Sequence, residues 1–222
     1  MLRALKRRLH SHLLRDPKFR FLFDEPAAGE FVSVDCETTG LNPRKDEIVA
    51  LAAVKITGTR ILASERFEAT IRPSVKLSPD AIKIHGLREQ DVANGRSMDE
   101  ALPEFLRFVG ARPLVGYYLE FDVAMLNKHV RRMLGIELPN ERIEVSGLYY
   151  EIKYGDAPPG TQVDLKFASM LADLGLPAIE QHDAYSDALM TALMYVMLDD
   201  FKARGVRIPR QRPKPISWYG GT

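Results

Sequence analysis

The sequence predicts one α/β domain, built on a mixed sheet of about five strands with helices on its faces. Three early stretches, at 30–36, 47–57 and 60–72, have the β-branched and aromatic residues that are typical of strands. Only Gly58 and Thr59 separate the second stretch from the third, which favours a hairpin. Helical and extended patterns then alternate along the chain. This order predicts an antiparallel meander followed by parallel strands.

Two further strands are expected between helices in the middle of the chain. Apolar residues recur with helical spacing at 99–109 and at 121–134. Pro103 is expected in the first turn of the earlier helix, where its missing N–H does no harm. The segments 113–118 and 142–145 are predicted to be the fourth and fifth strands.

The last part of the body is predicted to hold a loop and two helices. Residues 151–163 are expected to form a loop, which is a candidate for a mobile flap. Asp164 is expected to cap a helix that stops at Gly175. The last helix is expected to begin near Asp183 and to run past Leu198. A Gly-rich phosphate-binding turn does not follow the first strand, which argues against a doubly wound dinucleotide-binding fold.

Composition is that of an ordinary soluble globular protein. Of the 222 residues, 45% are apolar and 27% are charged, and no apolar run approaches the ~18 residues of a membrane span. Cys36 is the single cysteine, so a disulfide within the chain is excluded and a reducing, cytoplasmic location is expected. The basic start of the chain lacks an uninterrupted apolar core and is not expected to be a secretory signal, although a transit peptide stays open.

The formal net charge of +1 hides an uneven distribution. Residues 1–20 and 201–222 each carry a charge of +6, whereas residues 21–200 carry −11. The acidic body of such a chain could gather carboxylates around a cation, and its basic ends could bind a polyanion. The alternative is that the basic ends are solvated tails. The expected units are a basic N-terminal extension, a folded body and a basic extended tail, at 1–29, 30–204 and 205–222.

The N-terminal extension has a helical pattern of its own. Leu2, Leu5, Leu9 and Leu13 share one stripe, and basic residues surround it. A helix of this kind could dock on the body, on a partner protein, on nucleic acid or on an anionic membrane surface. A membrane is the least expected of these partners, and the oligomeric state is left open.

Four acidic residues stand in settings unlike those of a solvated surface. Asp35 and Glu37 close the first strand, and their spacing of two places both side chains on one face. Asp122 begins a helix, and Asp187 lies among small apolar residues inside the last helix, where an unpaired charge is costly. His182 precedes Asp187 by five residues, and histidine is the side chain used most often as a general base.

Asp35 and Asp122 alone have plainer explanations, as a turn cap and a helix cap, whereas Asp187 is harder to explain in this way. Together they supply carboxylates from three separate elements, which suits two Mg²⁺ or Mn²⁺ ions. Two such ions can activate an attacking water and stabilise the leaving oxygen of a phosphodiester. The chain has no CxxC pair, HExxH, G-x-S-x-G or P-loop motif, so zinc, serine-hydrolase and P-loop chemistry are not favoured.

Four motifs, in order, resemble those of the DEDDh group of 3′–5′ exonucleases. They are VDCETTGLNP at 34–43, IHGL at 84–87, EFD at 120–122 and HDAYSDA at 182–188. Members of this group include the proofreading subunit of bacterial replicative polymerase, RNase T and oligoribonuclease. The resemblance covers roughly residues 30–200 and implies a ribonuclease H-like fold with two-metal hydrolysis.

The resemblance also implies a role for each catalytic candidate. Asp35, Glu37, Asp122 and Asp187 would hold the two ions. His182 would deprotonate the attacking water. A protein with these roles would need Mg²⁺ or Mn²⁺ for activity.

Substrate contacts are implied for the residues that follow the first strand. Thr38, Thr39 and Gly40 would bring backbone amides and a hydroxyl to the terminal nucleotide. Leu41 would be an apolar wedge against its base. His85, in the second motif, would approach the terminal sugar or phosphate.

Tyr118 is a departure from the family pattern. The family usually has Asn four residues before the aspartate of the third motif, as in HNAxFD, whereas this chain has GYYLEFD. Tyr118 could stack on a base or occlude the pocket. It therefore bears on substrate preference.

The leading hypothesis is a metal-dependent 3′–5′ exonuclease that releases nucleoside 5′-monophosphates from the 3′ end of single-stranded DNA or RNA. Within this class, DNA proofreading or repair competes with the trimming of RNA ends. A DNA polymerase is a candidate protein partner. The alternative is a catalytically weak nucleic-acid-binding or polymerase-associated module, for which Tyr118 and the basic ends are the motive.

Overall fold

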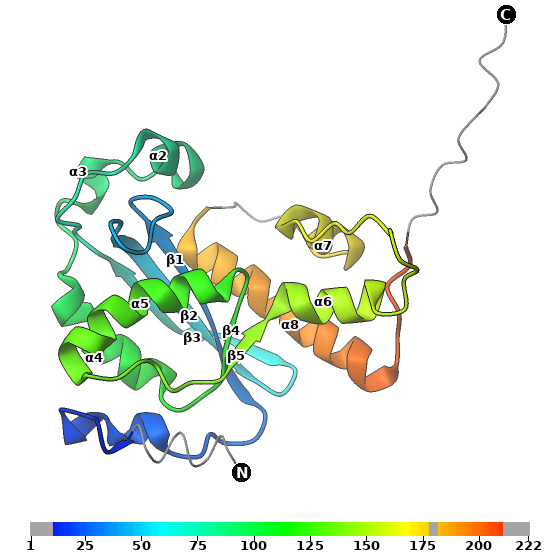
Figure 1. Cartoon of the computed structure of the whole chain (residues 1–222), viewed down its shortest axis with the longest axis horizontal. Coiled ribbons are helices and arrows are strands. Elements are labelled where there is room, and N and C mark those ends of the chain that lie inside the picture. The colour runs from blue at the N-terminus through cyan, green and yellow to red at the C-terminus, as the bar shows by residue number, and fades with distance from the viewer. Residues whose placement is uncertain (1–10, 178–181, 211–222) are drawn as a thin grey trace, which may run out of the picture.

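A five-stranded mixed sheet forms the centre of the protein (Figure 1), in a computed structural model that describes residues 11–177 and 182–210. The strand order is β3-β2-β1-β4-β5. β2 runs antiparallel to both of its neighbours, β1 and β3, whereas β4 and β5 run parallel to β1. The predicted meander followed by parallel strands is therefore confirmed. The strands are β1 (Glu30–Thr38), β2 (Ile48–Thr57), β3 (Arg60–Thr70), β4 (Leu114–Gly116) and β5 (Arg142–Glu144).

Helices cover both faces of the sheet (Figure 1). On one face lie α4 (Met98–Val109) and α5 (Leu119–Leu134). On the other face α8 (Ala184–Arg204) packs along β1 and β2 and against α6 (Val145–Tyr154). The shorter elements are η1 (Pro17–Phe23), α2 (Pro79–His85), α3 (Glu89–Val92) and α7 (Phe167–Asp173).

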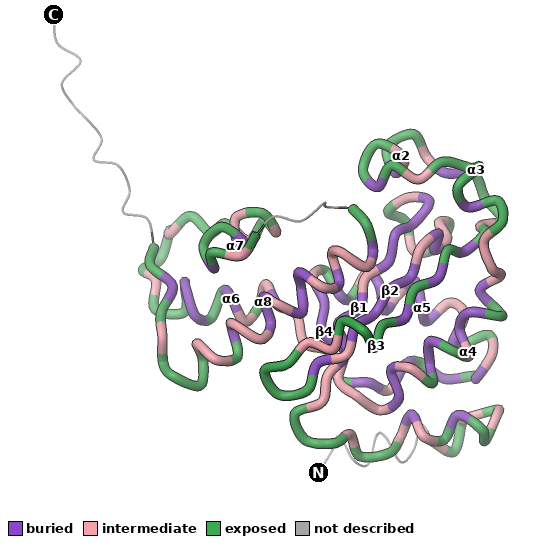
Figure 2. Tube along the Cα trace, turned by 180° about the vertical axis from the view of Figure 1, so that it is seen from behind, coloured by how far each residue is buried: buried purple, intermediate pink, exposed green. Residues whose placement is uncertain are grey.

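The alternation of side chains along β1 decides which of them reach which face. Val32, Val34 and Cys36 point into a core shared with α4 and α5, whereas Phe31 packs in the core with α6 and α8. Odd-numbered positions of β1 therefore face α8, because successive side chains of a strand point to opposite sides. Buried residues concentrate along β1 and β2 (Figure 2), so the end of β1 is set in the rigid centre of the molecule.

Two local predictions are corrected by the helices that surround the sheet. α6 extends to Tyr154, so the first part of the segment 151–163 is helical, because Ile152 and Tyr154 are buried in the core with α8. α4 begins at Met98, so Pro103 lies inside the helix and not in its first turn. Because proline has no N–H, one backbone carbonyl in the exposed first turn of α4 lacks its helical hydrogen bond, and water can bond to that carbonyl instead.

The capping of the last two helices agrees with the sequence in part. Lys166, and not Asp164, is the N-cap of α7, and Asp164 instead accepts a hydrogen bond from the Lys166 N–H at 3.0 Å. An acid bonded to the N–H two residues further on forms a turn of its own before the helix. Gly175, at φ +65°, follows the end of α7 as predicted, and Asp183 caps α8.

The described part of the N-terminal extension belongs to the packed body. Phe19 and Leu22 of η1 are buried in the core that contains α4. The Arg15 N–H donates to the Leu134 carbonyl at the end of α5. Most of the predicted basic helix, residues 1–10, lies outside the described residues.

The first residues of the predicted tail also lie against the body. Ile208 is buried, and the Arg207 guanidinium donates to the Glu151 carbonyl of α6. The rest of that tail, residues 211–222, lies outside the described residues. Within the described ranges, no helix is long and apolar enough to cross a bilayer.

Replacing Phe105 with alanine is expected to lower the free energy of unfolding by about 3–5 kcal/mol. The Phe105 side chain is fully buried, and its ring meets that of Phe67 between α4 and β3. Urea unfolding followed by circular dichroism measures the loss. Val163→Ala, at an exposed position, is the control and should stay within about 0.5 kcal/mol of the parent protein. Equal losses in the two variants would contradict this description of the core.

Candidate active site

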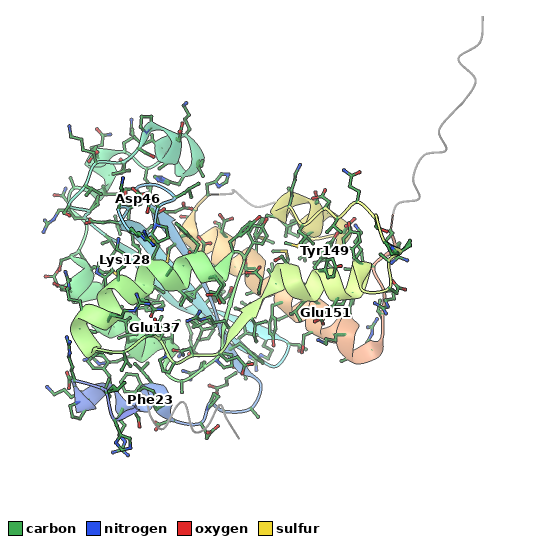
Figure 3. All side chains as sticks on the ribbon, in the orientation of Figure 1. Phe23, Asp46, Lys128, Glu137, Tyr149 and Glu151 are labelled. Atoms are coloured by element: carbon green, nitrogen blue, oxygen red, sulfur yellow. The ribbon has the colours of Figure 1, made fainter. Side chains whose placement is uncertain are left out.

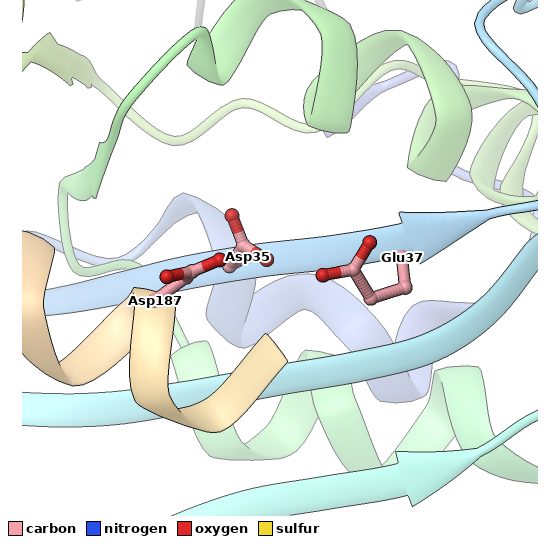
Figure 4. A group of neighbouring side chains, drawn as sticks. All are labelled: Asp35, Glu37 and Asp187. Atoms are coloured by element: carbon pink, nitrogen blue, oxygen red, sulfur yellow. The ribbon is translucent and has the colours of Figure 1, made fainter. Parts of the chain in front are cut away.

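Three carboxylates converge where β1 ends and α8 begins. Asp35 and Glu37 come from β1, and Asp187 comes from the first turn of α8. One oxygen of each carboxylate lies within 4.8 Å of the others. Figure 4 shows the three side chains in the space between the strand and the helix. The spacing of two residues in β1 thus places both acids on the face that α8 covers.

Crowding of negative charge shifts the proton affinity of these acids. Burial, followed by the charges of Asp122 and Glu37, raises the pKa of Asp35 well above its ordinary value. Burial, followed by the charge of Asp187, raises the pKa of Glu37 to about 7. Burial also raises the pKa of Asp187, although the His182 N–H opposes this shift. A proton or a cation relieves repulsion of this kind.

Asp122 lies beside the three-acid cluster and not within it. It is buried in the first turn of α5, on the side of β1 that Cys36 faces. Burial raises the pKa of Asp122, and hydrogen bonds from the thiol and the backbone of Cys36 lower it in part. After burial, Asp122 is the largest cause of the raised pKa of Asp35. The two carboxylates are therefore close electrostatic neighbours on opposite sides of the strand end.

His182 immediately precedes α8 and is tied to the acid cluster through its backbone. Its N–H donates to Asp187 Oδ2 at 3.0 Å. Its φ of +70° is one of two positive values at non-glycine residues of the described chain. The next residue, Asp183, caps α8 by accepting from the Ser186 N–H at 2.9 Å. His182 also lines the cavity that adjoins the carboxylates.

Polar groups of the turn after β1 hold one another. The Thr38 hydroxyl donates to the Gly40 carbonyl at 2.8 Å. Thr39 is fully buried, and its hydroxyl donates to the Asp46 carboxylate and accepts from the Glu47 N–H. A Cβ atom at Gly40 would lie 2.7 Å from a carboxylate oxygen of Asp46, so a larger residue there would displace the Asp46 side chain. A hydroxyl of this turn was predicted to lie near the substrate, but the hydroxyls of both threonines serve the turn itself.

Asp46 is the centre of this turn, and sequence patterns did not indicate it. Its carboxylate also accepts from the Asn42 N–H at 2.7 Å, and Lys128 of α5 donates to its carbonyl at 2.5 Å (Figure 3). An acid in a polar loop resembles many solvated acids, so only the folded contacts distinguish it. The turn displays Leu41, which is 78% exposed.

Both ring nitrogens of His85 are used inside the protein. Nδ1 accepts from the Leu87 N–H at 3.1 Å, and Nε2 lies 3.2 Å from the Thr38 carbonyl. Because a carbonyl only accepts, Nε2 carries the proton. Burial lowers the pKa of His85, which favours this neutral form. His85 therefore braces the end of β1, while its ring also lines the cavity.

A cavity of about 320 Å³ adjoins the acid cluster. Ala50 and Ala52 of β2 lie opposite Glu37 and Asp35 in the sheet, and these small side chains leave the space open. The volume is at the lower end of the range for ligand pockets, about 300–1,000 Å³, and suits one small ligand. Its polar lining comes from Glu37, Glu68, Thr70, His85, His182, Asp183 and Tyr185.

Glu68 and Tyr185 were not identified from the sequence. Glu68 reaches the cavity because β3 pairs with β2 so that Glu68 lies opposite Ala52. The Tyr185 ring is held under the guanidinium of Arg66, 4.6 Å from its centroid. Both placements depend on long-range pairing, which a local pattern does not reveal.

Tyr118 stands at the same end of the sheet but outside this cavity. It is the N-cap of α5 and has the second positive φ, +55°. Its side chain is 71% exposed and is not part of the cavity lining. β4 pairs in parallel with β1, so the residues after β4 emerge beside the acids of β1. Of the two roles suggested for Tyr118, occlusion of this cavity does not fit its position.

Stability of the metal-free protein is expected to fall as the pH rises from about 5 to about 8. The pKa of Glu37 is raised from 4.5 to about 7 in the folded state, so folding stabilises its protonated form. That contribution is complete below the unfolded pKa and is lost as the pH passes the folded pKa. Melting temperatures in EDTA measure the effect, and Glu37→Gln should flatten the pH profile. Glu25→Gln, an exposed control, should not; an unaltered profile in Glu37→Gln would refute this account.

Comparison with known proteins gives relatives along most of the chain. A family model described as "Exonuclease" (RNase T) matches residues 32–195. A PolC-type DNA polymerase III of Thermotoga maritima is 31% identical over 197 residues, which are 85% of this chain and 13% of that protein. The DNA polymerase III epsilon subunit of Aquifex aeolicus is 28% identical over 182 residues, which cover 82% of this chain and 86% of the subunit. The chain thus spans a small part of its PolC-type relatives.

Solved structures share the fold. Escherichia coli exonuclease I in a complex with single-stranded DNA aligns with a TM-score of 0.66 at 19% identity, over 79% of this chain and 41% of that one. Exonuclease X in complex with 5′ overhanging duplex DNA aligns with a TM-score of 0.59 at 24% identity, over 80% and 95% of the two chains. The expected ribonuclease H-like fold is confirmed. Because the family model covers more than half of the sequence, the chain belongs to the exonuclease family.

Proposed function

We propose that this protein is a metal-dependent 3′–5′ exonuclease, which hydrolyses phosphodiester bonds at the 3′ end of single-stranded DNA or RNA and releases nucleoside 5′-monophosphates. The observation that carries the proposal is the convergence of Asp35, Glu37 and Asp187 to within 4.8 Å. Three such carboxylates would repel a phosphate unless cations lie between them. The cluster therefore suits a phosphodiester only as a metal-loaded site.

Two Mg²⁺ or Mn²⁺ ions are the proposed cofactors. All the candidate ligands are carboxylate oxygens, which these cations prefer. The raised pKa values of Asp35 and Glu37 are those of acids that lack a neighbouring positive charge. Asp35, Glu37, Asp122 and Asp187 would hold the ions, with Asp122 approaching from the side of α5. When bound, the ions supply Lewis-acid stabilisation of charge on the phosphate and the leaving oxygen.

His182 is the proposed general base. His182 lines the cavity together with Glu37, and the hydrogen bond from its N–H to Asp187 fixes the position of its backbone. Imidazole in that place can accept the proton of an attacking water. The left-handed backbone at His182 is a local strain of the kind that gathers at functional sites.

The cavity beside the acids is the proposed site of the terminal nucleotide. Ala50 and Ala52 leave it open, and the exposed Leu41 is the proposed wedge against the terminal base. Thr38, Thr39 and Gly40 would contribute through the shape and backbone of their turn, since their hydroxyls bond within it. The nitrogens of His85 are occupied, so its ring would contact the sugar by its edge.

DNA is the proposed natural substrate, with proofreading or repair as the role. The relatives are DNA polymerase III proteins, and solved neighbours are complexes with DNA. A replicative DNA polymerase is accordingly the proposed protein partner. A cytoplasmic location is compatible with this role and stays a prediction.

Asp187→Asn is expected to lower Mg²⁺-dependent degradation of a 5′-labelled single-stranded oligonucleotide by at least about a hundredfold. The substitution removes one charge from the acid cluster and preserves the shape of the side chain. Denaturing gels show the ladder of products shortened from the 3′ end.

Asp199→Asn is the matched control, because Asp199 is an exposed residue of the same helix. It should degrade the oligonucleotide at the parental rate. Undiminished hydrolysis by Asp187→Asn would refute the assignment. Binding without turnover by the parent protein, with either Mg²⁺ or Mn²⁺, would instead favour a catalytically weak nucleic-acid-binding module.

DNA and RNA oligomers of matched sequence should be degraded at different rates, with DNA the faster. The 2′-hydroxyl is the physical difference that a protein reads at the sugar. Initial rates of nucleotide release from the two oligomers, under the same conditions, make the comparison. Equal or faster degradation of RNA would overturn the choice of DNA and favour trimming of RNA ends.

A further inference from the structure

We propose that Tyr118, Tyr117 and Phe167 form an aromatic platform on which one unpaired base of the substrate strand stacks. The inference rests on the proposed function, because the strand concerned is the one that the acid cluster would cleave. It adds a specific surface for the strand outside the cavity and a physical reason for a preference for unpaired ends.

Tyr118 combines strain with exposure. Its φ of +55° lies in the left-handed region, where the backbone of an aromatic residue is strained. Asparagine adopts this region more readily. The side chain is also 71% exposed, so packing into the core does not compensate the strain. An exposed aromatic residue with a strained backbone indicates a role in function and not in stability.

The Tyr118 ring has a fixed support beneath it. It meets the ring of Tyr117 edge to face, with centroids 4.6 Å apart, and Tyr117 in turn meets Phe167 of α7 at 5.1 Å. The Tyr117 hydroxyl donates to the Leu165 carbonyl at 3.1 Å, which ties the loop before α7 to this row. The result is a row of three rings with one end open to solvent.

The far side of α7 is anchored as well. Tyr149 (Figure 3) and Lys153 of α6 both donate to the carboxylate of Asp173, and Lys153 also donates to the Tyr149 hydroxyl at 2.8 Å. Lys153 is buried, whereas Asp173 lies at the surface, so this contact is partly shielded from solvent. The platform therefore rests on two helices, and binding a base would need little further ordering.

The platform lies at the proposed catalytic end of the sheet. β1 and β4 are parallel neighbours, with Ser33 opposite Val115, so Tyr117 and Tyr118 emerge alongside Asp35. Of the exposed large apolar side chains in the described ranges, Leu41 and Tyr118 are the two most exposed, at 78% and 71%. Each of them follows one of these two strands. The apolar surface of this end is thus concentrated next to the acids.

An unpaired nucleobase is the ligand that this chemistry fits. Every base has a flat face that stacks favourably on an aromatic ring, whatever the identity of the base. A base inside a duplex is stacked and paired already, and would have to be released first. The platform would therefore favour single-stranded or frayed ends without selecting a sequence.

The test uses the full chain and a fluorescent oligothymidylate, with binding measured in Ca²⁺ and without Mg²⁺ or Mn²⁺, so that the carboxylates hold a cation while the proposed cofactors for cleavage are absent. Tyr118→Asn removes the ring and relieves the strain, and should raise Kd about fivefold or more while keeping or raising the melting temperature. Tyr118→Phe keeps the ring and should bind like the parent protein. Tyr150→Asn is the control, because Tyr150 is an exposed tyrosine of α6 outside the platform, 44% exposed.

An abasic site moved through the last few nucleotides locates the stacked base. At one position it should weaken binding by the parent protein to the level of Tyr118→Asn, and the two proteins should then bind equally. An unchanged Kd in Tyr118→Asn, or equal weakening in Tyr118→Phe, would overturn the platform. So would weaker binding with a lower melting temperature and no abasic position that equalises the two proteins.

Cleavage of the same oligonucleotide in Mg²⁺ separates this inference from the proposed function. If the parent protein cleaves but its Kd does not depend on Tyr118, the platform fails and the exonuclease stands. If the parent protein does not cleave while its Kd depends on the ring, the platform stands and the exonuclease fails.

Discussion

Repulsion among Asp35, Glu37 and Asp187 is the constraint on which the rest of the site depends. Their carboxylates are held within 4.8 Å of one another, and nothing about a folded chain favours this without a cation. The fold imposes it. β1 is the middle strand of the sheet, and α8 packs along it, so neither element can move apart to relieve the charge. Because packing of the sheet and α8 holds the carboxylates close together, a cation bound among them would be stabilised by all three charges.

The parts of the site that follow from the sequence are those that short-range geometry fixes. The alternation of a strand places Asp35 and Glu37 on one face whatever the rest of the chain does. Asp187 lies in the first turn of a helix capped by Asp183, and the local sequence also predicts this helix start. The contact between β1 and α8, however, depends on the order of the elements and on the packing of α8. Local patterns do not predict it, and only the family resemblance implies that the acids of the two elements share one site.

The parts that could not be predicted depend on contacts between distant residues. Glu68 enters the cavity through the register of β3 on β2, and both nitrogens of His85 are engaged by its surroundings in the fold. Predicted helix boundaries were wrong for the same reason. The end of α6 looked like a loop because Gly and Pro follow it closely, yet Tyr154 is buried against the core and holds the last turn. Burial outweighs local propensity at such positions.

His182 and Tyr118, the two non-glycine residues of the described chain with a left-handed backbone, both stand at the end of the sheet that holds the acids. Their backbones have different causes. At His182 the N–H must reach Asp187 just before the helix begins. At Tyr118 the chain must turn sharply from β4 into α5, where the Leu119 N–H is held by Glu144. That turn requires the conformation but not the aromatic ring, and a smaller residue would satisfy it with less strain. The ring is therefore best explained by something that it contacts from the solvent side.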